Sequence, residues 1–585
     1  MCLAVISSDR SRIFALLTPL VLVVHGFHPL ADDGAVYVTG IKKLANPSLY
    51  QADAVFALSP THLSIFAHVL AIPLHRGLLP LPALLLVCHL ASIFLFLLGC
   101  WRVAERIFPA DCSRWGAVLL AACCFTLPVA GTSLCIMDPY VTARSFSTPL
   151  SLFALAAVLD EQWMQCAGWL ALAALLHPLM AIYAAIAVFT VAIAKSGRWG
   201  FLIIFLCLGW ILCAVIFMRT HPAEHTSAFN LAALSRSYFF LSSWRWYEYP
   251  GLLIPLLLLG IAGARNRTPA GILAIAAFTL GAGALLISIC FVHRNGSLWL
   301  ARLQVLRSFQ FVYIAGVLLL GGWLGALAQR HRLAIGALYL SIALALFAGQ
   351  RLNYPASSHV EWPYRAPHNP WQQAFLWIRA NTPRDALFAL DNDYIEGPGE
   401  DAQGFRATAE RSTVADYFKD GGIASNFSQA ALPWLQGSQA TFQLNSATDA
   451  ERFNRLLPLG VTWIVLPTQA STALTCPFSN AVARVCRLKP VSQVLWSDKD
   501  REVWFSLGEN HEEACRFGLH QSRNCSAPDF ASPHGRRKIE QLWSKNVHAD
   551  AVSKAYFRLR VAARSIGCRR PARFALVAQG GRAGS

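Results

Sequence analysis

The sequence is short of charged residues. They make up 14% of its 585 residues, whereas a soluble domain carries about 25%. Hydrophobic residues make up 55%, and they are concentrated in residues 13–349, while residues 350–585 have an ordinary soluble composition. This distribution excludes a protein that is soluble throughout, and it predicts one part in lipid followed by one in water.

Several signatures of soluble enzymes are also missing. The sequence has no Walker loop, no dinucleotide-binding fingerprint and no nucleophile elbow, and no cysteine spacing matches a zinc site. Half of the 16 cysteines lie inside apolar segments, where they act as small hydrophobic side chains. Cys476 and Cys486 lie in the polar part and can pair if that part faces an oxidising compartment. We expect no nucleic-acid partner.

The apolar part predicts a polytopic α-helical membrane protein with about eleven transmembrane helices, because about 20 apolar residues cross a bilayer. The predicted spans are 13–30, 78–101, 115–134, 146–160, 165–176, 178–194, 199–218, 251–264, 270–292, 303–327 and 332–349. A shorter segment, 61–75, is expected to lie in the membrane interface. Lys and Arg in short loops favour the cytoplasm, which places the N-terminus inside and the C-terminal part outside the inner (plasma) membrane.

The composition divides the chain into three predicted parts. Residues 1–349 form a transmembrane helical domain with an outer loop at 31–77. Residues 350–507 form an extracytoplasmic soluble α/β domain, because short apolar runs fit for buried strands alternate with helical patterns. Residues 508–585 hold fourteen Lys/Arg against six Asp/Glu and no apolar period, which predicts a basic, disordered tail, with a lipid-binding arm as the alternative.

Within the C-terminal part, 371–380 has helical spacing, while 386–390 and 461–467 are predicted buried strands. Residues 494–508 are predicted to form a β-hairpin. The segment GFRATAERSTV carries a charge cluster, Arg406, Glu410 and Arg411. This cluster is interpreted as an anionic-substrate site, as a contact to the membrane-domain loops, or as an internally paired group.

Three outer segments, 31–56, 137–149 and 293–302, carry polar groups that are expected to converge. The candidate catalytic residues are the adjacent Asp32 and Asp33, because a carboxylate at the membrane surface can act as a general base. Arginine suits a phosphate through its planar donors. The candidate substrate-binding residues are Arg144, Asp138, Lys42, Lys43, His177 and Arg294, and Arg307 follows at the next helix start.

Structural alternatives apply to the same residues. Asp32 or Asp33 can cap the helix that begins near Gly34. Arg144 can pair with Asp138 as a structural clamp. The break at His177-Pro178 either lines a cavity or forms the tip of a packed helical hairpin, because proline removes a backbone hydrogen bond that lipid cannot replace.

The chain also resembles a known superfamily. An acidic pair after the first transmembrane helix, an interfacial helix, about eleven spans and an extracytoplasmic C-terminal domain resemble the GT-C superfamily of polyprenyl-phosphate-sugar glycosyltransferases. The segments DDGAVYVTGIKKLANPSLYQADAVF, DPYVTARSFSTPLSL, LLHPLMAIYAAIAVF and GFRATAERSTVADYF are similar to a group of uncharacterised bacterial membrane proteins of that build.

The resemblance implies a donor sugar on a polyprenyl phosphate, drawn from the membrane lipid. It implies that Asp32 or Asp33 acts as base or binds the acceptor, in some members with a divalent metal. No WWDYG-type motif occurs, which argues against protein N-glycosylation. A transferase of this kind predicts a cavity shared by the acidic loop, Arg144 and the C-terminal domain.

Two other functions remain open from the sequence. A transporter or lipid flippase usually shows two similar halves and charged residues near the middle of the bilayer, and neither feature is visible here. A non-catalytic membrane scaffold that presents the α/β domain is the third interpretation, although eleven spans are many for an anchor.

Overall fold

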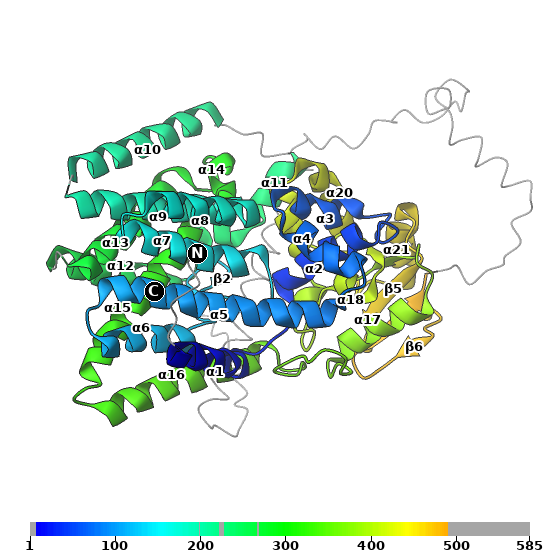
Figure 1. Ribbon diagram of the computed structural model, residues 1–585. Helices are drawn as coiled ribbons and strands as arrows, with labels where there is room; N and C mark the ends of the chain where they lie inside the picture. The colour runs from blue at the N-terminus through cyan, green and yellow to red at the C-terminus, as the bar shows by residue number, and fades with distance from the viewer. Residues whose placement is uncertain (1–7, 198, 221–226, 266–267, 489–585) are drawn as a thin grey trace, which may run out of the picture. The chain divides into compact units, whose positions relative to one another are not determined.

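The computed structural model describes residues 8–197, 199–220, 227–265 and 268–488 (Figure 1). These residues belong to one compact unit, Met1–Val491. The predicted hairpin at 494–508 and the predicted basic tail at 508–585 lie outside the described residues.

Each of the eleven predicted apolar segments contains a helix. These helices are α1 (Ser8–His25), α5 (Leu81–Ile107), α6 (Asp111–Cys123), α7 (Ala143–Leu159), α8 (Trp163–Leu176), α9 (Pro178–Ser196), α10 (Trp199–Thr220), α12 (Glu248–Arg265), α13 (Pro269–Phe291), α15 (Phe309–Leu327) and α16 (Arg332–Asn353). Six helical segments among the described residues are long and apolar enough to cross a membrane: α5, α9, α12, α13, Leu298–Leu327 and α16. The chain is therefore a polytopic helical membrane protein.

Small residues let two of these helices approach closely. A Cβ atom on Gly116 of α6 would lie 2.4 Å from the carbonyl oxygen of Gly321 in α15. One turn further along α15, a Cβ on Gly325 would lie 2.2 Å from the carbonyl oxygen of Cys112. Close backbone packing through glycine is a common way for helices to associate in lipid, where the hydrophobic effect does not drive them together.

Shorter elements connect these helices. They are α2 (Asp32–Ala45), α3 (Ala54–Leu58), η1 (Ser59–Leu63), α4 (Phe66–His75), β1 (Pro128–Val129), β2 (Leu134–Cys135), α11 (Ala228–Leu234), η2 (Ser237–Phe239), η3 (Leu241–Ser243), α14 (Leu298–Arg302) and η4 (Val305–Ser308). The predicted span 115–134 ends early, because β1 and β2 form a small antiparallel hairpin after α6.

The segment predicted at the membrane interface, 61–75, is sharply bent. Helices Ala54–Leu63 and Phe66–His75 meet at 115°. The bend is held to the end of α8, where the Ser64 hydroxyl donates to the carbonyl of Leu176 at 2.5 Å. Val69 and Ile72 of α4 are about half exposed, so this helix presents an apolar surface. Such a surface fits contact with lipid rather than with water.

Residues 370–488 carry a five-stranded mixed sheet with strand order β4-β3-β5-β7-β6. Its elements are α17 (Pro370–Asn381), β3 (Leu387–Ala389), η5 (Tyr394–Glu396), α18 (Phe405–Ala409), β4 (Ser412–Thr413), α19 (Lys419–Ala424), α20 (Ser428–Ala440), α21 (Asp449–Leu456), η6 (Leu457–Leu459), β5 (Trp463–Pro467), β6 (Phe478–Ser479) and β7 (Ala483–Arg487). The two predicted buried strands contain β3 and β5, which pair in parallel. Cys476 and Cys486 form a disulfide.

Alternate residues of the central strands face two separate apolar clusters. Phe388 and Val465 pack with residues of α17 and α18, including Phe375. Ala389 and Ile464, the next residues along the same strands, pack with residues of α21. This period of two follows from the pleat of a strand, and it explains why both runs are apolar throughout.

Residues 26–80, between α1 and α5, are called the first loop, and residues 354–488, after α16, are called the sheet region; backbone hydrogen bonds join the two. Phe27 pairs with Val360, and Ala31 pairs with Gln403. Gly404 permits this contact, because a Cβ there would lie 2.1 Å from the Cβ of Ala35. Figure 1 shows α2, α3 and α4 beside α18 and α20, and contacts join α2 to α18 and α3 to α20. The start of α2 is therefore held both by the first loop and by the sheet region.

Candidate functional site

The predicted acidic pair opens α2. The residue at the N-cap is Ala31, and no side-chain cap is formed, so neither Asp32 nor Asp33 caps the helix. Both carboxylates lie in the first turn, where the helix dipole favours negative charge. Asp32 adopts φ 51°, a conformation that costs energy for a residue other than glycine, and its N–H donates to Ala402 at 2.8 Å. The surrounding backbone therefore holds the pair in place.

A lysine from the sheet region contacts both carboxylates. The ammonium group of Lys419, at the start of α19, pairs with Asp32 and with Asp33, the latter at 3.0 Å. The Tyr140 hydroxyl donates to the second carboxylate oxygen of Asp32 at 3.2 Å. The side chains of Asp32 and Asp33 remain 37% and 35% exposed. The pair is thus partly neutralised and still open to solvent.

The acidic pair does not fit a divalent metal. An ammonium group lies between its carboxylates, and the described residues contain no group of three His, Cys, Asp or Glu that could hold a metal ion. Mg²⁺ is often held by one or two carboxylates together with waters and substrate phosphates, but here Lys419 already contacts both carboxylates. In this arrangement the ammonium group of Lys419 partly balances the charge of the two carboxylates, in the place that a metal would take.

Asp138 and Arg144 form a buried ion pair. Arg144 Nη2 donates to Asp138 Oδ2 at 2.5 Å, and each side chain is about 5% exposed. The pair is held at the start of α7, where Thr142 and Ser145 form a capping box. The structural clamp is thus present, but Nε of Arg144 is buried without a hydrogen-bond partner. One donor of this guanidinium is therefore unsatisfied in the folded chain.

Tyr37 marks the point where these charges meet. It follows Asp33 by four residues and so lies on the same face of α2. Burial raises its pKa to about 12; the charges of Arg144 and Arg307 lower it, and those of Asp33 and Asp138 raise it. Burial also raises the pKa of Asp138. The charge of Arg144 lowers this pKa, and the charge of Asp33 raises it. The acidic pair and the buried ion pair therefore share one electrostatic environment.

Arg307 brings a second guanidinium to this group. It belongs to η4 and lies 5.0 Å from the ring centre of Tyr238. Its Nε is buried without a hydrogen-bond partner, and its guanidinium forms no ion pair within the described part of the chain. His177 accepts from the N–H of Met180 at 3.4 Å as the cap of α9, and the charges of Arg144 and Arg307 both act on it. We name Asp32, Asp33, Tyr37, Asp138, Arg144, Arg307 and Lys419 the polar cluster.

Three other candidates lie elsewhere. Lys43 is buried and donates to the carbonyls of Pro47 and Leu49, so it supports its own loop. Lys42 donates to Glu410 at 2.7 Å. Arg294 donates to the Ser243 hydroxyl at 3.3 Å. None of these contacts joins the polar cluster.

The charged segment of α18 contacts the membrane-domain loops, as one of its three interpretations requires. Arg406 forms two bonds to Asp420, at 2.8 and 2.9 Å, and its Nε pairs with Asp53 of the first loop. Arg411 instead donates to backbone carbonyls, including that of Thr382 at 2.6 Å. The guanidinium groups of Arg406 and Arg411 already bind partners within the chain, so they do not form an anion site.

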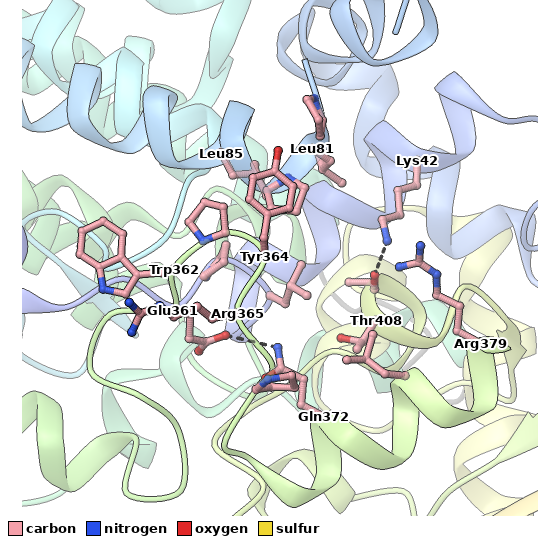
Figure 2. A pocket seen from close by; sticks show the side chains of 18 of the residues that line it. Lys42, Leu81, Leu85, Glu361, Trp362, Tyr364, Arg365, Gln372, Arg379 and Thr408 are labelled. Carbon is pink, nitrogen blue, oxygen red and sulfur yellow. Dashed lines mark hydrogen bonds between the residues drawn. The ribbon is translucent and has the colours of Figure 1, made fainter. Parts of the chain in front are cut away.

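A large cavity lies beside α2. Its volume is about 880 Å³, and it is lined by residues of α2, α4, α5, α17, α18 and the segment 358–368. Figure 2 shows Lys42 and Arg379 on one side of it and Leu81 and Leu85 on another. The first loop and the C-terminal region share this cavity as predicted, but Arg144 does not line it, and neither does the acidic pair.

Comparison with known proteins adds one match. Residues 369–421 match the family model described as Domain of unknown function (DUF6798). A comparison with curated proteins gives no match. The matched segment runs from α17 into α19, and it contains both Arg406 and Lys419, the residues that contact the first loop.

Sequence reasoning missed Lys419 and Tyr37. Lys419 is about 386 positions from the acidic pair, and nothing in the local pattern connects them. Tyr37 had a usable signal, because a residue four positions after Asp33 shares its helix face.

Proposed function

We propose that the chain is an integral-membrane glycosyltransferase that uses a polyprenyl-phosphate-linked sugar on the outer face of the membrane. The observation that carries the proposal is the polar cluster. It combines accessible carboxylates, Asp32 and Asp33, with two guanidinium groups, Arg144 and Arg307, whose buried Nε donors have no partner.

The reaction assigns a role to each charge. The acceptor hydroxyl attacks the anomeric carbon of the donor, and the bond from that carbon to the phosphate oxygen breaks. Asp33 or Asp32 takes the hydroxyl proton as general base. Arg144 and Arg307 bind the departing polyprenyl phosphate and stabilise the charge that grows on it.

The same proposal includes eleven spans, a cytoplasmic N-terminus and an extracytoplasmic C-terminal α/β domain in the plasma membrane. The Cys476–Cys486 disulfide supports this orientation, because disulfides persist in oxidising compartments. Cys112, at the start of α6, lies in a predicted cytoplasmic loop and is free.

Peptide-level mass spectrometry tests the orientation in intact cells. After mild reduction, a membrane-impermeant maleimide should label Cys476, which is partly exposed, while Cys112 should be labelled only after the cells are lysed. Labelling of Cys112 alone in intact cells would reverse the topology and remove the extracytoplasmic reaction.

Reconstituted vesicles test the chemistry. Purified protein is mixed with radiolabelled polyprenyl-phosphate hexoses, and the release of free polyprenyl phosphate is measured. Asp33→Asn should lower turnover by about 100-fold or more, the range expected when a general base is lost. Arg307→Gln should lower kcat as well as raise the KM for the donor, because this guanidinium is assigned both binding of the phosphate and stabilisation of its growing charge.

Asp385→Asn is the matched control, because Asp385 is an exposed carboxylate of the sheet region. It should leave turnover unchanged. If Asp32→Asn and Asp33→Asn both retain wild-type turnover with a donor that the wild type uses, the acidic pair has no part in transfer.

A further inference from the structure

The large cavity beside α2 has an apolar wall that continues toward the membrane. This wall is formed by Leu74 of α4 and by Leu81 and Leu85 of α5. Helix α5 is long and apolar enough to cross the membrane, and the cavity lies at its first turns. Leu78, between α4 and α5, is 70% exposed. A hydrocarbon chain in the outer leaflet would therefore meet an apolar surface that leads into the cavity.

Two exposed aromatic side chains stand on the segment 358–368. Trp362 and Tyr364 line the cavity and are 46% and 76% exposed (Figure 2). Tyr364 adopts φ 66°, so the backbone is bent sharply at this point. Tryptophan and tyrosine collect at membrane–water interfaces, where one end of the ring system meets hydrocarbon and the other meets water. Two such rings beside the cavity fit a position at the membrane–water interface.

The opposite wall carries an excess of positive charge. Lys42 and Arg379 share one carboxylate, that of Glu410, at 2.7 and 3.4 Å. Arg365 lines the same cavity, and its guanidinium forms no ion pair or hydrogen bond with any residue that the structure describes. The other acidic residue of the lining, Glu361, is engaged by His28 and Gln372. Three basic side chains, Lys42, Arg365 and Arg379, thus line the cavity with two carboxylates.

We propose that this cavity binds a membrane amphiphile with a phosphate-type anionic head group and a hydrocarbon chain. The head group contacts Lys42 and Arg379, the chain lies against Leu81, Leu85 and Trp362, and Arg365, on the side of Glu361 and Trp362, adds positive charge to the same cavity (Figure 2). A volume of about 880 Å³ holds a head group and the first part of a chain, the rest of which extends into the bilayer.

The site is distinct from the polar cluster and does not depend on the transferase proposal. No residue of the polar cluster lines the cavity. A soluble phosphate would leave the apolar wall and the exposed aromatic rings uncovered, whereas a neutral lipid would leave the cation excess uncompensated. An anionic lipid covers the apolar wall with its chain and balances the positive charge with its head group.

Native mass spectrometry of the full chain in detergent tests the proposal by titration with three probes. These are dioleoyl phosphatidic acid, dioleoyl phosphatidylcholine and glycerol 3-phosphate. We expect phosphatidic acid to bind at least about 10-fold more tightly than phosphatidylcholine, and glycerol 3-phosphate to neither bind nor compete. The double variant Arg365→Gln, Arg379→Gln should weaken the binding of phosphatidic acid by about 10-fold, which corresponds to about 1.4 kcal/mol.

A matched pair of substitutions controls for general charge. Arg330→Gln with Arg332→Gln removes two exposed arginines, one just before α16 and one at its first position, away from the cavity lining, and should leave the affinity unchanged. Ala45→Trp adds a large side chain to the cavity wall and should weaken phosphatidic acid without changing the melting temperature.

Each alternative occupant gives a different result. Equal binding of both lipids, or an equal loss in the control pair, would show nonspecific lipid association and overturn the site. Competition by glycerol 3-phosphate at a similar concentration would show a soluble-phosphate site instead. If Ala45→Trp lowers the melting temperature, the exposed arginine variants decide the question, since they do not threaten folding.

Discussion

Two ion clusters join the first loop to the sheet region, and they differ in burial. In the first, Arg406 lies between Asp53 and Asp420, and all three side chains are at most 11% exposed. In the second, Lys419 lies between Asp32 and Asp33, and the three side chains are 25–37% exposed. Both clusters place one cation between two carboxylates, so burial is the main difference between them.

Burial decides what each cluster can do. A buried charge that loses its partner costs about 3–5 kcal/mol, whereas an exposed pair contributes about 0–1 kcal/mol. The Arg406 cluster is therefore a fixed joint between two parts of the chain. The Lys419 cluster holds carboxylates that a substrate can reach, and its rearrangement costs little.

The largest expected effect comes from breaking the buried cluster. Arg406→Gln leaves Asp53 and Asp420 buried without a cation, so we expect unfolding to become easier by about 3–5 kcal/mol. Thermal melting of the purified protein in detergent should show a strong decrease in melting temperature. Arg384→Gln, an exposed arginine of the same region, is the control and should stay within about 0.5 kcal/mol. A wild-type melting temperature for Arg406→Gln would mean that the joint is not structural.

Glu400 sharpens the comparison, because it is buried like the Arg406 cluster but has no cation partner among the described residues. Its side chain accepts the N–H of Gln403 at 3.0 Å, and its other oxygen is unpaired. Burial raises its pKa well above the ordinary value of 4.5. The folded state therefore holds this proton more tightly than the unfolded state, and stability falls as pH rises above about 4.5 toward the folded-state pKa.

Glu400→Gln removes this dependence. At pH 7 the variant should be more stable than the wild type by about 1–3 kcal/mol and should melt at a higher temperature. This difference in stability should disappear near pH 4, where the wild-type carboxyl is protonated in both states. Melting curves between pH 4 and 8 measure it. Asp385→Asn, at an exposed position, should show no such difference. A difference that widens toward low pH would mean that Glu400 is ionised and paired in the folded protein.

The sequence pattern predicted the helices and strands whose formation depends on the length and periodicity of one apolar segment. The eleven apolar segments became helices, and the two apolar runs of the C-terminal part became β3 and β5, because length and periodicity determine burial. The Asp138–Arg144 clamp was also within reach, since both residues lie in one short segment. The early end of α6 was not, because the β1–β2 hairpin depends on turn geometry within an apolar run.

The site was predicted only in part for a related reason. The charges of Asp33 and Asp138 both act on Arg144, whereas Lys419 reaches the acidic pair from a distant segment that packs against α2. The cavity has its cationic and apolar walls on five helices and one loop, so no single stretch of sequence reveals it. Lys42 was selected for its charge and belongs to that cavity rather than to the acidic pair.

The smallest expected effect tests the exposed cluster. Lys419→Gln removes the cation between Asp32 and Asp33, yet both carboxylates remain about one-third exposed and can be solvated by water. We expect a stability change below about 1 kcal/mol, measured by the same melting assay as for Arg406→Gln. A loss as large as that of Arg406→Gln would show that both clusters are structural joints, and the acidic pair would then have no freedom to act on a substrate.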